Sequence, residues 1–196
     1  MSDTLLLTNT NDTAFESIFP EKIQKLSKIH WTPIPVVRKA ASFLAQAPGA
    51  KILDIGSGIG KFCIAGAQLF PDSEFHGIEQ RKNLVDYAKM AKKVNGTENV
   101  HFAHGNFTQL DFQNYDSFYF YNSFGENLID IAHIDESVEH SSSLYIYYSN
   151  YLYNELNYRP KGTRLVTFHG FDHQIPYCYH LEESHNQGVL RMWIKK

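Results

Sequence analysis

The chain has 196 residues, of which 43% are hydrophobic, and this length suits one α/β domain with a full core rather than two domains. Its net charge of −3 and isoelectric point near 6.3 provide no basic footprint, which disfavours tight binding to nucleic acid and favours small or basic partners. No apolar stretch approaches the length of a membrane span and no secretory leader begins at Met1, so we expect a cytoplasmic protein that makes no use of a membrane. Cys63 and Cys178 form neither a metal-binding spacing nor a disulfide framework, and we expect both to be reduced, buried thiols.

The N-terminal part is predicted to be helical after a loose tail. Residues 1–14 are rich in Thr, Asn and Asp and are predicted to form that tail, while residues 15–48 are predicted to form helices. One helix is expected to begin at Pro20 and another near Pro33, since proline is favoured in the first turn of a helix. The whole of 1–196 is expected to be a single domain, with its core in residues 51–196.

The core alternates between strands and helices. Strands are expected at 51–55, 75–79, 100–103, 117–121 and 164–168, with helices at 59–69, 81–94 and 135–156. This alternation predicts a parallel sheet. The last two expected strands, 175–181 and 189–194, are joined by the short segment 182–188, which suits an antiparallel hairpin.

The most informative motif follows the first expected strand. Residues 51–60 read KILDIGSGIG, so Asp54 and three alternate glycines, Gly56, Gly58 and Gly60, stand between an apolar strand and a helix. Glycine lets the backbone approach a ligand closely, and the N–H groups of the following helix point to the same place. Glu79 ends the second expected strand, beside the tip of the first, where a carboxylate can accept both hydroxyls of a ribose.

This motif resembles that of the class I S-adenosylmethionine-dependent methyltransferases. Dinucleotide enzymes use G-x-G-x-x-G, whereas this chain has D-x-G-x-G-x-G followed by Glu79. The resemblance implies a Rossmann-like three-layer sandwich with a mostly parallel seven-stranded sheet in the order 3-2-1-4-5-7-6. It also implies S-adenosyl-L-methionine as cofactor, bound by the residues Asp54, Gly56, Ser57, Gly58, Gly60 and Glu79.

Four further residues are expected to border the cofactor. Asn106 and Phe107 follow the third strand, where methyltransferases commonly bind adenine, and Gln80 directly follows the ribose carboxylate. All three are also ordinary residues for a turn at a strand end. Thr32 lies in a segment before the sheet that can fold over the cofactor, where its hydroxyl can bind the methionine carboxylate. Thr32 can equally cap the helix that begins near Pro33.

Asn122 and Phe124 are the candidate catalytic residues. Methyl transfer is an in-line displacement, so the protein has mainly to align a neutral nucleophile and exclude water. An Asn carbonyl can hold an amino group by its N–H while an aromatic neighbour packs on the acceptor. The two prolines that nucleic-acid amino methyltransferases place after this Asn are missing. The Asn-x-Phe form resembles the non-SET histone-lysine methyltransferases and their small prokaryotic relatives, which implies an unidentified nitrogen acceptor, either a protein lysine or a small-molecule amine.

Two other functions fit the sequence less well. A nicotinamide-dependent oxidoreductase is opposed by the glycine spacing and the terminal hairpin, and a non-catalytic cofactor-binding or scaffold domain is supported only by the lack of a strong general base.

The tyrosines between 145 and 158 suggest an aromatic cage, but their helical spacing favours packing in the core or at an interface. His169, His173 and His180 have no ligand spacing with one another, and we predict no metal site.

Overall fold

The computed structural model describes residues 11–128 and 133–196. Its strands are β1 (Lys51–Ile55), β2 (Glu74–Glu79), β3 (Val100–His104), β4 (Ser117–Phe120), β5 (Arg164–Phe168), β6 (Tyr179–His185) and β7 (Leu190–Lys195). Its α-helices are α1 (Asp12–Glu16), α2 (Glu21–Gln24), α3 (Ser27–His30), α4 (Ile34–Leu44), α5 (Lys61–Leu69), α6 (Lys82–Asn95) and α7 (Ser142–Asn157). Short 3₁₀ helices are η2 (Phe107–Gln109), η3 (Phe112–Asn114), η4 (Gly125–Asn127), η5 (Asp172–Gln174) and η6 (Asn186–Gly188). In this part of the chain, no helix is long and apolar enough to cross a bilayer.

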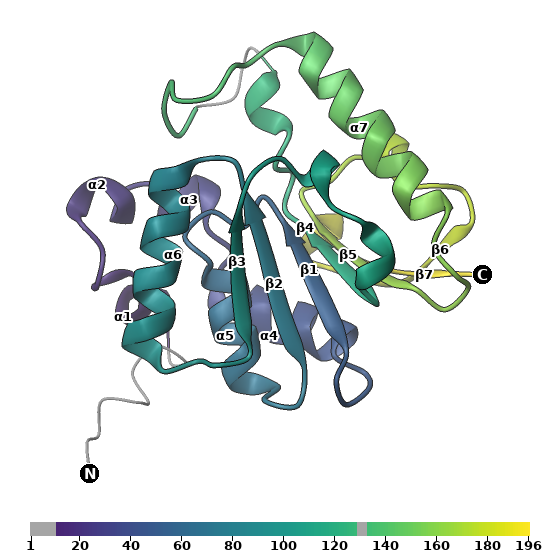
Figure 1. Ribbon diagram of the computed structural model, residues 1–196. Helices are drawn as coiled ribbons and strands as arrows, with labels where there is room; N and C mark the ends of the chain where they lie inside the picture. The colour runs from purple at the N-terminus through teal and green to yellow at the C-terminus, as the bar shows by residue number, and fades with distance from the viewer. Residues whose placement is uncertain (1–10, 129–132) are drawn as a thin grey trace.

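The seven strands form one sheet in the order β3-β2-β1-β4-β5-β7-β6 (Figure 1). The first five strands pair in parallel, and β7 runs antiparallel to both β5 and β6. This confirms the predicted order and the C-terminal hairpin. Because the parallel strands all end at the same edge, their carboxyl ends bring distant segments of the sequence together.

Helices cover the sheet on both faces, and the alternation of side chains along each strand divides the core in two. Ile52 of β1 packs with α4, α5 and the N-terminal helices, whereas Leu53 and Ile55 pack in the second cluster with Leu152 and Leu156 of α7. Figure 1 shows α7 on the opposite side of the sheet from α4 and α5. A strand buried on both faces carries a nearly continuous apolar run, as β1 and β4 do.

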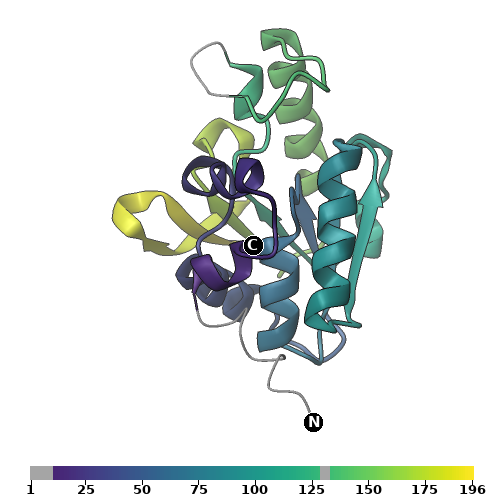
Figure 2. The ribbon, with the colours of Figure 1, turned by 90° about the vertical axis from the view of Figure 1, so that its left-hand side faces the viewer.

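The N-terminal segment is more ordered than predicted. Residues 11–14, expected in the loose tail, begin α1, and the side chain of Asn11 accepts a hydrogen bond from the N–H of Ala14 at 2.9 Å. The carboxylate of Asp12 accepts the N–H of Ile34 at 2.8 Å and so caps α4. Residues 1–10 of the expected tail lie outside the described residues. Figure 2 views the side on which α1–α3 lie.

Three predicted boundaries were wrong. The single helix expected from Pro20 is divided into α2 and α3, which are separated at Lys25 and Leu26. The helix expected from Asp135 begins at Ser142, where the Ser141 hydroxyl caps the N–H of Leu144, because Asp135 is held by polar contacts elsewhere. The strand expected at 175–181 is shifted to Tyr179–His185, since the chain turns at residues 177–178 and the N–H of Tyr179 bonds to the carbonyl of Pro176.

Candidate active site

A pocket opens at the carboxyl ends of β1, β2 and β4. The empty space in the pocket and its open mouth together amounts to about 1090 Å³. Eleven of the twelve predicted site residues line it: Thr32, Asp54, Gly56, Ser57, Gly58, Glu79, Gln80, Asn106, Phe107, Asn122 and Phe124. Gly60 does not line the pocket. It precedes α5 with a φ of +76°, and a Cβ there would lie 2.3 Å from the ring of Phe102.

The glycine loop brings the backbone against two other segments. At Gly56, with a φ of +79°, a Cβ would lie 2.3 Å from the hydroxyl oxygen of Ser123 in the loop after β4. At Gly58, with a φ of +54°, a Cβ would lie 2.6 Å from the ring of Trp31. Only glycine combines this left-handed conformation with such close contacts. The loop is therefore the junction between β1, the loop after β4 and the N-terminal segment.

Glu79 lies at the end of β2 with its carboxylate in the pocket wall. The N–H of Gly58 donates to Oε2 at 3.1 Å, and the N–H of Arg81 donates to Oε1 at 2.8 Å. Burial raises the pKa of Glu79, while these hydrogen bonds and the nearby charge of Arg81 oppose that rise. Each carboxylate oxygen keeps acceptor capacity beyond one hydrogen bond, so Glu79 can also accept two hydroxyl groups.

Asp54 lies deeper in the pocket wall than Glu79, and its pKa is far above the usual value of an aspartate. Burial raises its pKa to about 8, a hydrogen bond from the Cys63 thiol at 3.6 Å opposes the rise, and repulsion from Glu79 adds to it. Cys63 is buried, as expected, whereas Cys178 is only partly buried. A cationic ligand beside Asp54 would favour its charged form.

Asn106 and Phe107 occupy the pocket wall after β3, but the Asn106 side chain also has structural partners. Its amide oxygen accepts from the N–H and the hydroxyl of Thr108 at 3.1 and 3.0 Å, and its NH₂ group donates to the Tyr148 hydroxyl at 2.7 Å. Asn106 thereby caps η2, as the turn interpretation predicted. Phe107 stacks on Phe124 with ring centroids 5.0 Å apart.

Thr32 is buried in the pocket wall and is not the cap of α4. Pro33 occupies the N-cap position, and its side chain makes no capping hydrogen bond. The hydroxyl of Thr32 instead shares a 3.0 Å hydrogen bond with the hydroxyl of Tyr119 on β4. The capping interpretation was therefore wrong, and Thr32 joins the N-terminal segment to the sheet at the pocket.

Asn122 begins the loop after β4 in a strained conformation. Its φ is +36°, which is uncommon for a residue with a side chain. Its buried amide oxygen has no hydrogen-bond partner among the described residues, and the same holds for Ser57 Oγ and His30 Nε2 in the same pocket. Buried polar atoms without partners are rare in proteins, so three of them around one pocket indicate a site built for a polar ligand.

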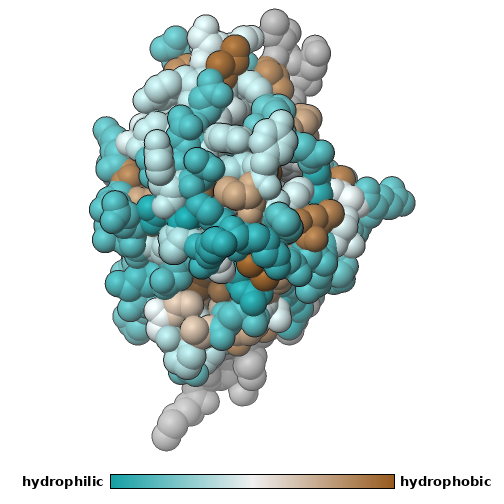
Figure 3. All heavy atoms as spheres, turned by 90° about the vertical axis from the view of Figure 1, so that its right-hand side faces the viewer, coloured by the Kyte–Doolittle hydropathy of each residue, from teal (hydrophilic) through white to brown (hydrophobic). Residues whose placement is uncertain are grey.

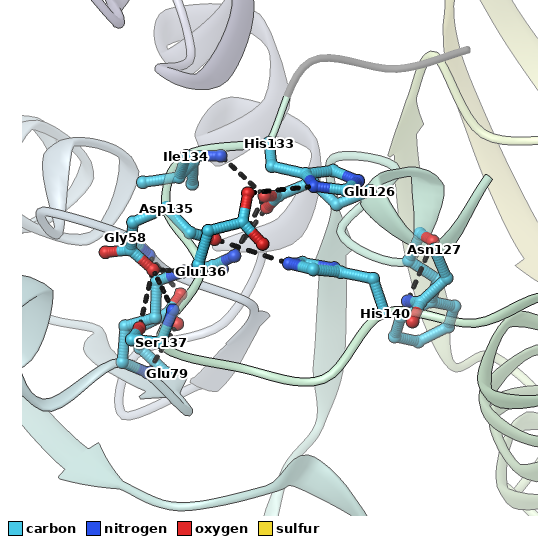
Figure 4. A network of polar contacts seen from close by, with 12 residues as sticks. Gly58, Glu79, Glu126, Asn127, His133, Ile134, Asp135, Glu136, Ser137 and His140 are labelled. Atoms are coloured by element: carbon cyan, nitrogen blue, oxygen red, sulfur yellow. Dashed lines mark hydrogen bonds and ion pairs between the residues drawn. The ribbon is translucent and has the colours of Figure 1, made fainter. Parts of the chain in front are cut away.

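A polar network closes the side of the pocket beyond Glu79 (Figure 4). The guanidinium of Arg81 binds both oxygens of Glu126 at 3.2 and 2.8 Å and donates to Asp135 at 3.0 Å. Glu126 also accepts the N–H of Ile134, which lines the pocket. Partial burial acts to raise the pKa of Asp135, but hydrogen bonds from Ser137 and Arg81 hold it at about 2. The loop after β4 and residues 133–137 are thus fastened to the turn after β2.

The sequence did not identify several residues of this site. Arg81, Glu126 and Lys61 were missed because their partners are distant in the chain, although Glu126 stands only two residues after Phe124. Tyr148 was assigned to packing, yet it both packs on Phe107 and lines the pocket. His169 does not line the pocket.

Comparison with known proteins agrees with this geometry. The methyltransferase domain family matches residues 46–150, which is more than half of the chain. A tRNA (guanine-N(7)-)-methyltransferase of Synechococcus sp. (strain JA-3-3Ab) is 46% identical over 54 residues, or 28% of this chain and 23% of that protein. An arsenite methyltransferase of Halobacterium salinarum is 36% identical over 70 residues, or 35% of this chain and 18% of that protein. The matched segments therefore span less than a quarter of these relatives.

A solved structure shares the fold over most of the chain. It is an RNA methyltransferase from Salinibacter ruber in complex with S-adenosyl-L-homocysteine, with a TM-score of 0.55 and 21% identity, covering 84% of this chain and 91% of that one. None of these comparisons supports the resemblance to histone-lysine methyltransferases in particular. The family match, the strand order and the glycine loop facing Glu79 together show that the chain belongs to the methyltransferase domain family, with the class I S-adenosylmethionine-dependent fold.

Proposed function

We propose that this protein transfers a methyl group from S-adenosylmethionine to a nitrogen acceptor. The cofactor supplies a methyl group that is already activated on a sulfonium. The residues of the chain therefore have to bind and orient the two reactants and to exclude water. The observation that carries the acceptor assignment is the buried, unpartnered amide oxygen of Asn122 in the pocket wall. Family membership supports the cofactor, and it leaves the nicotinamide-dependent alternative without support.

The cofactor half of the pocket is assigned to the loop after β1 and the end of β2. Glu79 would accept the ribose hydroxyls, while Gly56, Gly58 and Ser57 would face the amino-acid portion of the ligand. The Ser57 hydroxyl is suited to this role because it is buried without a partner. Gln80, Asn106 and Phe107 would surround the adenine, with Phe107 as the apolar neighbour of the ring. Thr32 remains our candidate for the methionine carboxylate.

The acceptor half is assigned to the loop after β4. The Asn122 oxygen would accept an N–H of the acceptor and leave the nitrogen lone pair free for the methyl group. Phe124 packs against Phe120 and Phe107 at centroid distances of 4.7 and 5.0 Å and so forms a rigid apolar wall behind Asn122. An amine is favoured over a nucleic-acid base because the chain is acidic overall and lacks the paired prolines of the nucleic-acid amino enzymes.

The acceptor is proposed to be a protein lysine or a small-molecule amine. The tRNA and arsenite acceptors belong to the relatives that carry those names, and their matched segments are short. An acceptor screen with labelled S-adenosylmethionine should therefore include lysine-rich proteins, small amines and transfer RNA. Label in protein or amine supports the proposal, whereas label in RNA alone overturns the assignment of the acceptor.

The cofactor is tested by calorimetric titration with S-adenosylhomocysteine, with NAD as control. Binding of S-adenosylhomocysteine alone is expected. Binding of NAD alone, or of neither ligand, would overturn the proposal.

The role of Asn122 is tested by Asn122→Ala, with the exposed Asn150→Ala on α7 as control. We expect Asn122→Ala to bind S-adenosylhomocysteine normally and to lose turnover, because the cofactor contacts are elsewhere. The control variant should keep both properties. An equal loss of binding and turnover in Asn122→Ala would make Asn122 a cofactor ligand and remove its assigned role with the acceptor.

A further inference from the structure

Three side chains with metal-binding chemistry lie together on the sheet, and none of them lines the pocket. Glu74 and His76 are two residues apart on β2 and therefore point to the same face. His101 on the edge strand β3 pairs with His76 in the parallel register. One ligand atom from each of the three side chains lies within 4.8 Å of the others. This cluster could not be recognised in the sequence, because His76 and His101 are 25 positions apart.

The geometry is close to that of a zinc site. Ligand atoms about 2.0–2.2 Å from a tetrahedral ion lie about 3.4 Å from one another. His76 Nε2 is already 3.3 Å from Glu74 Oε2. The rings of His76 and His101 stack with their centroids 4.8 Å apart and their planes at 25°, so the His101 ring has to turn before its nitrogen can face the same ion. His101 is exposed, which leaves its side chain room to do so.

The surroundings allow a cation to bind. The only other charged group recorded in contact with Glu74 among the described residues is Lys51, whose Nζ lies 4.0 Å from Oε2. The Lys51 side chain is 48% exposed and can turn into solvent when an ion takes its place. The ring of Tyr115 packs against that of His76 in an edge-to-face contact, with 5.3 Å between centroids, and covers one side of the cluster.

We propose that Glu74, His76 and His101 bind a divalent ion of the zinc class, with water in the fourth position. Two imidazoles and one carboxylate are a ligand set that zinc uses, whereas magnesium prefers oxygen ligands alone. The ion would join the edge strand β3 to β2 near the start of β2, at the end opposite Glu79. The bound ion would stabilise that edge of the sheet. This metal site does not depend on the proposed methyl transfer.

The test uses the full chain, purified without a histidine tag, stripped with EDTA and titrated with ZnCl₂ at about pH 7.5, where imidazole is mostly neutral. We expect one saturable site per chain for Zn²⁺, no heat with MgCl₂, and a higher melting temperature in the presence of Zn²⁺. His101→Ala should weaken Zn²⁺ binding by at least about tenfold, because even the outer partners of metal ligands commonly contribute that much. The control is His180→Ala, an exposed histidine on β6 outside the cluster.

Two results would overturn the proposal. One is the absence of saturable Zn²⁺ binding to the wild-type chain. The other is unchanged binding in His101→Ala, which would place the ion elsewhere, for example at the stacked pair His133 and His140. The melting temperature of each metal-free variant shows whether it is folded, and Glu74→Gln provides a second test should His101→Ala not fold.

Discussion

At the scale of single residues, the backbone of the fold fixes the position of the Glu79 side chain. Two backbone N–H groups fix its carboxylate at the pocket wall. If it also holds the ribose, Glu79→Ala should weaken S-adenosylhomocysteine binding by about 3 kcal/mol, the contribution of a charge-assisted pair of hydrogen bonds. Calorimetric titration measures this loss, with the exposed Glu98→Ala as control. Unchanged affinity in Glu79→Ala would exclude Glu79 from the cofactor site.

The predictable residues of the site belong to a local motif. Asp54, the glycines and Glu79 occur within one strand–helix–strand unit, and the conformation of that unit follows from a short stretch of sequence. Arg81 and Glu126 form their bond across 45 residues. A charged residue in isolation gives no indication of which distant partner it will meet, so this half of the site could not be predicted from the sequence.

At the scale of elements, the N-terminal helices are held to the pocket by a buried ion-pair cluster. The ammonium group of Lys61 at the start of α5 lies 2.6 Å from Asp12 and 2.5 Å from Glu16, and the Lys61 side chain is only 2% exposed. Glu16 also accepts a hydrogen bond from Ser27. This cluster ties α1 and α3 to the helix that follows the glycine loop.

Removing one carboxylate should therefore loosen the N-terminal helices. Glu16→Ala leaves Lys61 buried with an incomplete set of partners, and we expect a loss of about 3 kcal/mol in stability together with faster proteolysis of residues 11–33. Glu21→Ala is the matched control, because its ion pair with Lys25 is exposed and should contribute less than about 1 kcal/mol. Chemical unfolding and limited proteolysis measure both effects. Equal behaviour of the two variants would show that the cluster does not hold this segment.

The two misplaced elements illustrate what hydrophobic pattern alone misses. The strand expected at 175–181 was chosen for its apolar residues, but β6 is an exposed edge strand and most of its side chains are polar. Ile175 is buried beside α7 rather than in a strand. The start of α7 was placed too early because nothing local shows that Asp135 is bound to Arg81, although the run of serines at 141–143 is a recognisable capping signal.

At the scale of the whole molecule, the sheet was predictable because hydrophobic alternation and chain topology leave few arrangements. Figure 3 views the side on which the C-terminal hairpin lies and shows mainly hydrophilic atoms with scattered hydrophobic ones. Polar side chains on an edge strand such as β6 discourage pairing with another chain. The identity of the acceptor was not predictable, because it depends on the shape of a pocket formed by seven separate segments of the chain.

The stability of the whole chain should depend on pH through Asp54. Its pKa is about 8 in the folded chain and about 3.8 when unfolded, so between these values the folded state binds the additional proton. The contribution of Asp54 to the free energy of unfolding should therefore fall by about 1.4 kcal/mol for each pH unit as pH rises from about 5 to about 7. Asp54→Asn should remove that contribution, and the exposed Asp86→Asn should not. Parallel slopes for Asp54→Asn and the wild type in urea unfolding at several pH values would contradict this.

The hydrogen bond between Thr32 and Tyr119 spans 87 residues, and this separation has a consequence during synthesis. Residues 11–33 leave the ribosome before their partner on β4, which is made only after the central strands β1–β3. The early ion pairs with Lys61 can hold α1 before that point, but the bond that joins Thr32 to the pocket wall forms only after most of the sheet has been translated. Nascent chains stalled before Tyr119 should therefore be cleaved near Thr32 by added protease more readily than chains stalled after the full sheet has emerged. Translation order thus leaves this wall of the pocket incomplete until β4 has been made.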